Sequence, residues 1–332
     1  MGKSRIAIVG DVHGAWDSKL DAQALELLKP DLVLFVGDFG DENVQIVQEI
    51  SKLGMPKAAI LGNHDCCYSA AHKPTPKKCS SATKRLDQML KALGDDHVGY
   101  RRKDYPDLKL SVIGVRPFAT GGNRFYNSEF LSSTYGVDNM EQSATRIAHL
   151  ALSAPEGHSL VFLGHNGPAG LGSQPGDICG KDFDKGGGGD HGDPDFARAL
   201  DMVREQDASR VALVVFGHMH RQLLGYNRGK QRKMCLCDAK SAAKTGTVYV
   251  NGAVVPRCED ERRHFTVVDM AAGRVESVRE TWVAVPKDGP AHLACEEVLF
   301  AHRPVLAVKN RAQRVPSNNV CAATAKLKAS IF

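Results

Sequence analysis

The sequence lacks an apolar run long enough to cross a membrane, which takes about 18 or more consecutive apolar residues. It also lacks a paired cysteine framework, because its nine cysteines are odd in number and scattered along the chain. This usage argues against a small secreted disulfide protein and favours a reducing compartment. We therefore expect a globular protein that has no membrane partner.

A strong charge of either sign is missing too. The chain has 43 Lys and Arg residues against 38 Asp and Glu residues, a formal net charge of +5. That excess is too small to indicate nucleic acid as a partner. The first strand-like run, residues 5–10, begins almost at Met1, so no leader segment is expected in the chain as given. The expected location is the cytoplasm, or a plastid if a transit peptide was removed.

The first third of the chain alternates short apolar runs with amphipathic stretches. The pattern predicts strands at residues 5–10, 32–36 and 58–61. It predicts a helix at residues 18–28 and a second helix that begins after Asp41, the expected N-cap. Strands that are connected through helices by short links favour an α/β sheet with parallel strands.

The rest of the chain is less regular. Residues 167–195 form a long loop with four consecutive glycines, and such loops often cover functional sites. From residue 286 the periodicity is weak and the end is basic, so we expect a domain over residues 1–285 and a weakly structured tail over residues 286–332. Further helices are predicted at 83–93, 143–152 and 196–205, and further strands at 108–115, 159–163, 211–216, 247–250 and 265–269.

Five of the predicted strands end in a glycine that is followed by side chains able to bind metal. The carboxyl ends of parallel strands meet at one edge of a sheet, which is where ligands bind. Residues two apart in an extended segment share a face, so each Asp-x-His or His-x-His pair can reach one site. The side chains in question are Asp11, His13, Asp38, Asn63, His64, Asp65, His165, His218 and His220.

This set mixes carboxylates, imidazoles and an amide, and it contains no thiolate. Such a mixture suits Mn, Fe, Zn or Mg and argues against a structural zinc site. There are more candidate ligands than one ion can use, which indicates two divalent metal ions. A pair of ions is a known device for in-line displacement at phosphorus.

The ordered motifs Asp-x-His, Gly-Asp, Gly-Asn-His-Asp, Gly-His and Gly-His-x-His resemble the signature of the calcineurin-like metallophosphoesterase superfamily. They extend from Asp11 to His220. The resemblance implies an α/β fold in which two packed mixed β-sheets are flanked by helices. It also implies hydrolysis of a phosphomonoester or phosphodiester by a hydroxide that bridges two metal ions.

The resemblance implies a role for each motif residue. His64 would contact the phosphoryl group or act as the general acid, and Asp65 would orient its imidazole. Asp38 would bridge the two ions. One ion would be held by Asp11, His13, Asp38 and His220, and the other by Asp38, Asn63, His165 and His218.

The branch and the substrate are less constrained. The Ser/Thr protein phosphatase branch carries Asp-Arg-Gly after its Gly-Asp and a glutamate after its Asn-His; here Gly40-Asp41-Glu42 and Asp65 stand instead. That branch is therefore disfavoured, while the run at 164–168 resembles an uncharacterised cyanobacterial and plastid branch. The expected substrate is a phosphorylated small molecule or nucleotide. A catalytically silent scaffold of the same fold and a nuclease remain as alternatives.

Three polar residues follow the glycine run, namely Asp190, His191 and Asp193. They can be interpreted as a further metal site or as solvated turn residues. We favour solvated turn residues, because Asp and similar side chains are common in turns for local reasons.

Overall fold

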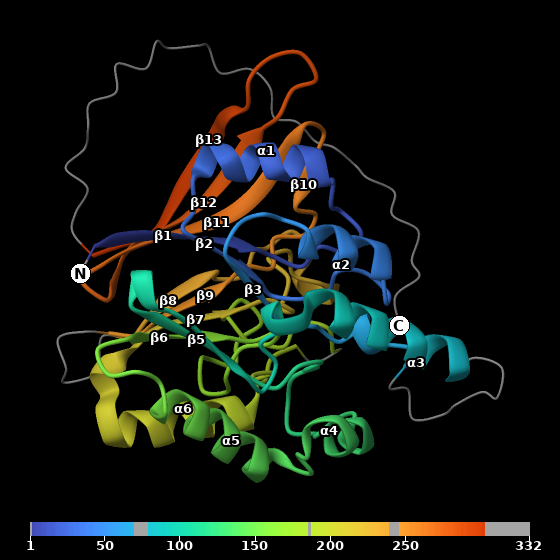
Figure 1. Ribbon diagram of the computed structural model, residues 1–332, viewed down its shortest axis with the longest axis vertical. Coiled ribbons are helices and arrows are strands. Elements are labelled where there is room, and N and C mark those ends of the chain that lie inside the picture. Colours follow the sequence, from blue (N-terminus) through green and yellow to red (C-terminus); the bar gives the residue numbers. More distant parts are fainter. Residues whose placement is uncertain (1, 70–78, 185–186, 239–245, 303–332) are drawn as a thin grey trace. The chain divides into compact units, whose positions relative to one another are not determined.

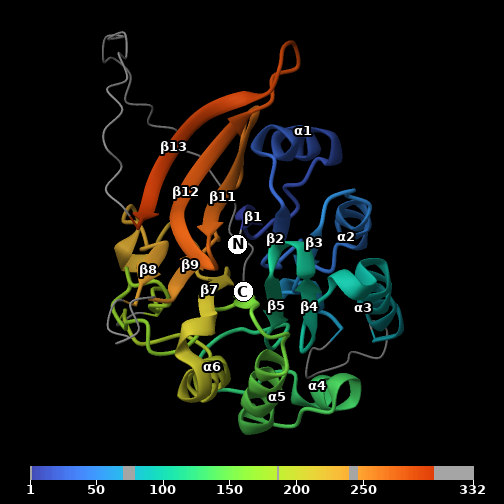
Figure 2. The ribbon, with the colours of Figure 1, turned by 60° about the vertical axis from the view of Figure 1, so that its left-hand side comes forward.

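The computed structural model describes residues 2–69, 79–184, 187–238 and 246–302, and of residues 79–83 it describes only the backbone. These residues form two β-sheets with helices on the outside, which confirms the expected fold class (Figures 1 and 2). Figure 1 shows α1 and α2 on the side of one sheet, and α5 and α6 on the side of the other. The residues beyond 302 in the expected tail lie outside the described part of the chain.

The first sheet has seven strands in the order β13-β12-β11-β1-β2-β3, with β10 paired to β11. β1, β2 and β3 are parallel, whereas β11 pairs with β1 in antiparallel orientation. The strands are β1 (Lys3–Val9), β2 (Leu32–Phe35), β3 (Lys57–Ala59), β10 (Cys258–Glu259), β11 (Arg262–Ala271), β12 (Arg274–Ala284) and β13 (His292–Ala301).

The second sheet has six strands in the order β4-β5-β6-β7-β9-β8. Its four central strands are parallel, and the two edge strands are antiparallel to their neighbours. The strands are β4 (Arg102–Tyr105), β5 (Leu110–Gly114), β6 (Ser159–Leu163), β7 (Val211–Phe216), β8 (Cys235–Cys237) and β9 (Val248–Asn251).

The helices begin at local caps. Asp17 accepts hydrogen bonds from the backbone N–H groups of Lys19 and Leu20 at the start of α1. Asn43 accepts from Ile46 N at 3.2 Å and caps α2, so the expectation that Asp41 is this cap is wrong. The helices are α1 (Ser18–Leu28), α2 (Val44–Ser51), α3 (Cys79–Leu93), α4 (Ser128–Tyr135), α5 (Met140–Leu152) and α6 (Pro194–Asp207). Short 3-10 turns are η1 (His64–Cys66), η2 (Gly94–Asp96), η3 (Pro106–Leu108), η4 (Ala208–Arg210) and η5 (Gly225–Asn227).

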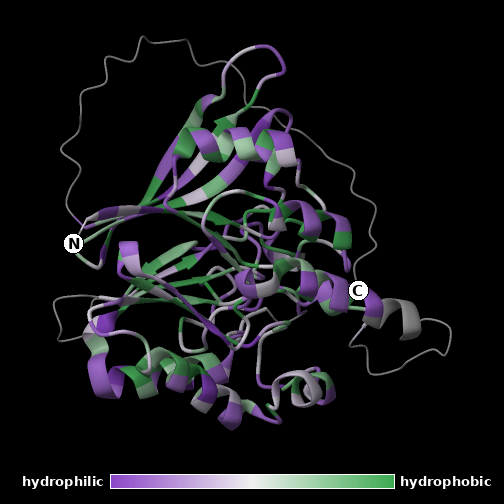
Figure 3. Ribbon diagram, viewed as in Figure 1, coloured by the Kyte–Doolittle hydropathy of each residue, from purple (hydrophilic) through white to green (hydrophobic). Residues whose placement is uncertain are grey.

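The core is built from the strands. All residues of β2, β3 and β7 are buried, as expected for strands that are covered on both faces. Figure 3 shows apolar residues concentrated in the strands and polar residues on the outer faces of the helices. In the described part of the chain, no helix combines the length and the apolar character needed to cross a bilayer.

The first sheet extends further than the sequence predicted. β13 pairs with β12 in antiparallel orientation from Ser277 opposite Ala301 to Ala284 opposite His292. This strand lies in the stretch that was expected to be a weakly structured tail from residue 286, so that boundary is wrong. Seven of its ten residues are exposed, which removes the apolar periodicity that would reveal a strand in the sequence.

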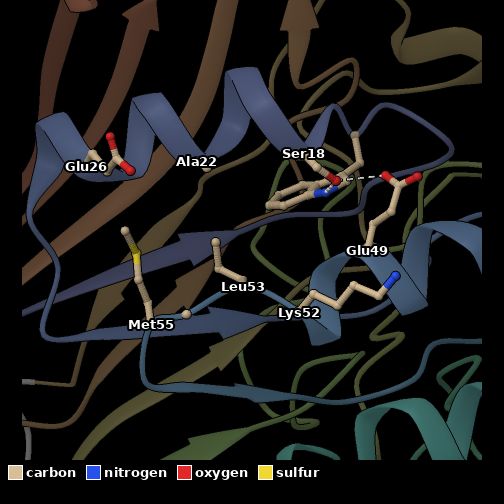
Figure 4. Close-up of a pocket in the computed structure, with 9 residues that line it drawn as sticks. Ser18, Ala22, Glu26, Glu49, Lys52, Leu53 and Met55 are labelled. Carbon is tan, nitrogen blue, oxygen red and sulfur yellow. Dashed lines mark hydrogen bonds between the residues drawn. The ribbon is translucent and has the colours of Figure 1, made fainter.

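A groove lies between the two helices that cover the first sheet. Ser18, Ala22 and Glu26 line it from α1, and Glu49 and Lys52 line it from α2 and its end (Figure 4). The hydroxyl of Ser18 donates to the carboxylate of Glu49 at 2.8 Å across the groove. This contact joins α1 to α2 at the surface.

Candidate metal centre

The polar motifs from both sheets converge at the carboxyl ends of the strands. Asp11 and His13 follow β1, and Asp38 follows β2. The backbone N–H of His13 donates to the carbonyl oxygen of Asp38 at 2.8 Å, and the N–H of His64 donates to Asp38 Oδ1 at 2.9 Å. The N–H of His218, after β7, donates to the carboxylate of Asp11 at 3.1 Å. These hydrogen bonds connect four loops around two buried carboxylates.

Three of the converging residues have an unusual backbone conformation. The φ angles of His13, Asp38 and His218 are 43°, 50° and 66°. These values lie in the left-handed region, which residues other than glycine rarely adopt. Each such residue costs roughly 1–3 kcal/mol. A fold retains such conformations where they position functional groups, and here they orient three of the side chains that face one another.

Two glycines leave room for the carboxylates. A Cβ atom at Gly62 would lie 2.2 Å from Asp38 Oδ1, and a Cβ atom at Gly217 would lie 2.2 Å from Asp11 Oδ1. Any side chain at either position would therefore displace a carboxylate. The Gly-Asn-His and Gly-His-x-His motifs need their glycine for this reason, because the backbone must pass close to the carboxylates.

One half of the centre consists of Asp11, His13 and His220, whose ligand atoms all lie within 4.8 Å of one another. Asp11 Oδ2 is 3.3 Å from His220 Nε2 and 4.0 Å from His13 Nε2. The two imidazole nitrogens, His13 Nε2 and His220 Nε2, are 3.2 Å apart. The Asp11 carboxylate is fully buried, whereas the His13 and His220 side chains are 25% and 33% exposed. This half is open to solvent on its imidazole side.

The other half consists of Asp38, His165 and His218, which form a second group within 4.8 Å. His165 Nε2 lies 3.3 Å from Asp38 Oδ1 and 2.9 Å from Asn63 Oδ1. His165 Nδ1 lies 2.8 Å from the carbonyl oxygen of Val36, to which it donates. Because Nδ1 is the donor in this hydrogen bond, Nε2 is the ring nitrogen that faces the oxygens of the site.

Both carboxylates are ionised although they are buried. Burial raises the pKa of Asp38, but the charge of His165 and its hydrogen bond outweigh burial and bring the pKa below its usual value. Burial likewise raises the pKa of Asp11, and the hydrogen bond to His220 with the nearby imidazoles lowers it overall. Two negative charges in the protein interior need compensating positive charge, which divalent cations provide.

The imidazole pKa values respond to the same charges. Burial lowers the pKa of His165, but the charge of Asp38 and its hydrogen bond raise it to about 10. Burial and then the positive charge of His165 lower the pKa of His218 to about 3. His218 therefore keeps a free lone pair, as a metal ligand requires.

The donor set fits two cations that share one carboxylate. Asp38 Oδ1 faces His165 at 3.3 Å, while Asp38 Oδ2 lies 3.8 Å from His13 Nε2 in the other half. One carboxylate thus faces both groups of imidazoles. The hard oxygens and borderline nitrogens of this set suit Mn, Fe, Zn or Mg. All seven residues predicted as metal ligands lie in one of the two halves or, for Asn63, beside His165.

His64 lies at the exposed half, but its partner differs from the predicted one. Its Nδ1 is 2.7 Å from Asp41 Oδ1, and its ring centroid is 5.0 Å from that of His13. Asp65 was expected to orient this imidazole. Its two carboxylate oxygens instead accept hydrogen bonds from Phe39 N at 2.9 Å and Gly62 N at 2.8 Å. Asp65 therefore holds the loops that carry Asp38 and Asn63, and Asp41 orients His64.

The polar residues after the glycine run are also packed more closely than expected. The Asp193 carboxylate is buried and forms an ion pair with Arg116 at 2.7 Å. The ring of His191 is stacked on that of His218, with centroids 6.0 Å apart and an interplanar angle of 22°. The interpretation of both as solvated turn residues is therefore wrong. Local sequence contained no signal for these contacts, because Arg116 is 77 residues from Asp193.

Comparisons with known proteins identify a matching family and similar solved structures. The model of the calcineurin-like phosphoesterase family matches residues 4–222. The solved structure of PhoD is similar with a TM-score of 0.50 at 9% identity, covering 91% of this chain and 72% of that chain. A dimetal phosphatase from Danio rerio has a TM-score of 0.47 at 12% identity, covering 90% of this chain and 99% of that chain. A search of curated proteins found no match.

Proposed function

Because this chain belongs to the calcineurin-like phosphoesterase family, we propose that it is a metal-dependent hydrolase of phosphomonoesters or phosphodiesters that uses two divalent cations. The observation that supports this most directly is the position of Asp38, whose two oxygens face imidazoles of the two separate halves. A carboxylate in that position can be shared by two ions. A scaffold without chemistry would not need such an arrangement.

We assign the ligands in accordance with this geometry. One cation would be held by the exposed half together with Asp38, and the other by the buried half together with Asn63. Two cations in these positions would lower the pKa of bound water and offset negative charge on the phosphoryl oxygens. The complete ligand set is Asp11, His13, Asp38 and His220 for the first, and Asp38, Asn63, His165 and His218 for the second.

His64 would act on the substrate itself. It lies beside His13 and is 28% exposed, so its ring can reach a group bound above the ligands. Asp41 accepts a hydrogen bond from Nδ1, which directs Nε2 away from Asp41. From that position Nε2 can contact a phosphoryl oxygen or donate a proton to the leaving oxygen. We assign Asp41 the positioning role.

The experiment that tests this function measures metal content and hydrolysis together. Protein purified with added manganese, iron or zinc is assayed by elemental analysis and with 4-nitrophenyl phosphate and bis(4-nitrophenyl) phosphate. We expect about two ions per chain and hydrolysis of at least one ester, lost on chelation and restored by metal. Bound metal without hydrolysis of any ester would indicate a silent scaffold and contradict the proposal.

A nuclease remains the second candidate, because both metal halves also suit a diester. It predicts hydrolysis of the bis-aryl ester and binding to nucleic acid that weakens steeply with salt. The net charge of +5 favours a small phosphorylated substrate instead.

A further inference from the structure

The glycine-rich loop returns to the metal centre and is anchored there by its backbone. The N–H of His191 donates to the carbonyl oxygen of Cys179 at 2.9 Å. The carbonyl oxygen of His191 accepts from Gly122 N at 3.0 Å and from Asn166 Nδ2 at 2.9 Å. Asn166 directly follows His165, one of the candidate ligands. The position of His191 is therefore fixed relative to the buried half of the centre.

Three rings form a row that leads outward from this half. His218 lies against the His191 ring at a centroid distance of 6.0 Å, nearly parallel to it. Phe183 meets the His191 ring edge-on, with centroids 5.0 Å apart and an interplanar angle of 79°. The row thus joins a candidate metal ligand to an aromatic side chain of the loop through a single intervening imidazole.

The outer ring of the row is fixed in place yet left open to solvent. Phe183 is 48% exposed, whereas the phenylalanines of the core are buried. Its neighbour Lys181 places its ammonium 5.4 Å from the ring centroid and pairs with Asp184. The backbone of Lys181 also exchanges hydrogen bonds with Gly188 and Gly189, both at 2.8 Å. An exposed aromatic ring that is held from two sides can receive a second aromatic group with little further ordering of its own side chain.

The glycines that follow allow the chain to return from Phe183 to His191. Gly187, Gly188 and Gly189 have φ angles of 56°, 91° and 103°, which residues other than glycine rarely adopt. The positive φ angles at residues 187–189 thus explain why glycines stand at these positions of the loop.

We propose that Phe183 and His191 form an aromatic subsite, which binds a planar aromatic group carried by the phosphoester substrate. The inference rests on the proposed function and narrows its substrate class to esters such as a nucleotide or an arylalkyl phosphate. Such a group is connected to the phosphoryl by a few rotatable bonds, so it can lie on the ring row while the phosphoryl is at the ligands. Rings stack on aromatic side chains with little dependence on their identity.

The test compares two substrates that share a leaving alcohol. Adenosine 5′-monophosphate and ribose 5-phosphate both release a primary 5′-hydroxyl, and only the first carries a base. If the enzyme acts on diesters, the methyl diesters of these two compounds are used instead. We expect kcat/KM to favour the nucleotide by about 10-fold or more. Phe183→Ala should remove that preference, and Phe183→Trp should retain it. In both variants kcat/KM for ribose 5-phosphate should stay within about twofold of the parent value.

Leu293→Ala provides the matched control, because Leu293 is 51% exposed on β13 and should leave the preference unchanged. A comparison of benzyl phosphate with ethyl phosphate shows whether the subsite binds the ring of a simple arylalkyl ester or only a nucleobase. If Phe183 is needed for a preference for benzyl phosphate over ethyl phosphate, and adenosine 5′-monophosphate is not preferred over ribose 5-phosphate, the subsite binds arylalkyl esters. If adenosine 5′-monophosphate is preferred over ribose 5-phosphate, the subsite binds nucleotides.

Two results would overturn the subsite. The first is a parent enzyme that hydrolyses ring-bearing and ring-free esters equally well. The second is a Phe183→Ala variant in which hydrolysis of both falls together, which would make Phe183 a structural residue. If no ester is hydrolysed by the metal-loaded parent protein, the proposed function fails as a whole, and this outcome is distinct from both.

Discussion

The two halves of the metal centre contain the same kinds of side chain but differ in burial. The His165 side chain is fully buried and donates to the carbonyl oxygen of Val36, so its position is determined by the core. His13 and His220 are one quarter and one third exposed. His64 lies on this open side, 5.0 Å from His13. The buried half is thus built for rigid metal binding, and the open half for access to substrate and solvent.

The largest effect should come from Asp38, which joins the halves. We expect Asp38→Asn to lose both ions and to reduce kcat/KM by roughly 10³-fold or more, because the metal ions contribute several kcal/mol of transition-state stabilisation. Elemental analysis and ester hydrolysis measure the two losses. Asp107→Asn, in η3 and exposed, is the control. Full activity in Asp38→Asn would show that the halves do not share this carboxylate.

The next effect separates chemistry from metal binding. His64→Ala should retain about two ions and lose roughly 10²- to 10⁴-fold in kcat, the range for general acid catalysis. The reason is that His64 Nδ1 pairs with Asp41 at 2.7 Å, whereas a ring nitrogen of His64 comes only within 4.8 Å of a ligand atom of His13 and of Asp38. Metal content and kcat are measured on the same preparation. A variant that loses its ions would show that His64 is a ligand.

The two halves should also bind metal unequally. In a metal titration of the parent protein we expect a tight site and a weaker site, since the buried half is held by the core. His165→Asn should weaken the tight site and His13→Asn the weaker one, each by more than the 10- to 100-fold that outer partners contribute. Isothermal titration measures both constants. If either substitution weakened both sites equally, the difference in burial would have no thermodynamic consequence.

A smaller effect distinguishes the two aspartates near His64. Asp41→Asn should lower kcat about 10- to 100-fold with normal stability, because Asp41 is exposed and its carboxylate orients the imidazole. Asp65→Asn should instead lower the free energy of unfolding by about 1–3 kcal/mol, because one buried backbone N–H loses its acceptor. Steady-state kinetics and urea unfolding of both variants make the comparison. The reverse pattern would restore Asp65 as the orienting residue.

The part of the metal centre that could be predicted from the sequence is the part that follows directly from the order of residues at the strand ends. A buried strand such as β6 or β7 ends at a glycine and a histidine, and the parallel arrangement places these ends together. Asp41 was misassigned, since an aspartate before a helix resembles a cap and its actual partner is 23 residues away. His191 was misassigned for a similar reason, because its contact with His218 depends on how a long loop packs.

The fold was likewise predictable where local sequence determines an element, and not where long-range pairing does. Strands with continuous apolar runs were located to within a residue or two, because burial on both faces is visible in the sequence. β13 was missed because it is an edge strand whose side chains are mostly exposed, and its position follows from pairing with β12. A strand with mostly exposed side chains lacks the hydrophobic pattern that specifies its register, so its pairing is not visible in the sequence.

The last effect concerns a histidine outside the metal centre, whose charge is determined by burial rather than by carboxylates. Burial lowers the pKa of His97 to about 4, whereas Asp38 raises that of His165. An unfolded histidine titrates near 6.5 and therefore binds a proton before folded His97 does. The stabilising contribution is complete above pH 6.5 and declines as the pH falls toward 4, by up to about 3 kcal/mol.

Asn at position 97 cannot titrate, so His97→Asn should show a smaller loss of stability between pH 7 and pH 4.5 in urea unfolding. The exposed His292→Asn variant should behave like the parent, and an unchanged pH dependence in His97→Asn would contradict burial as the cause.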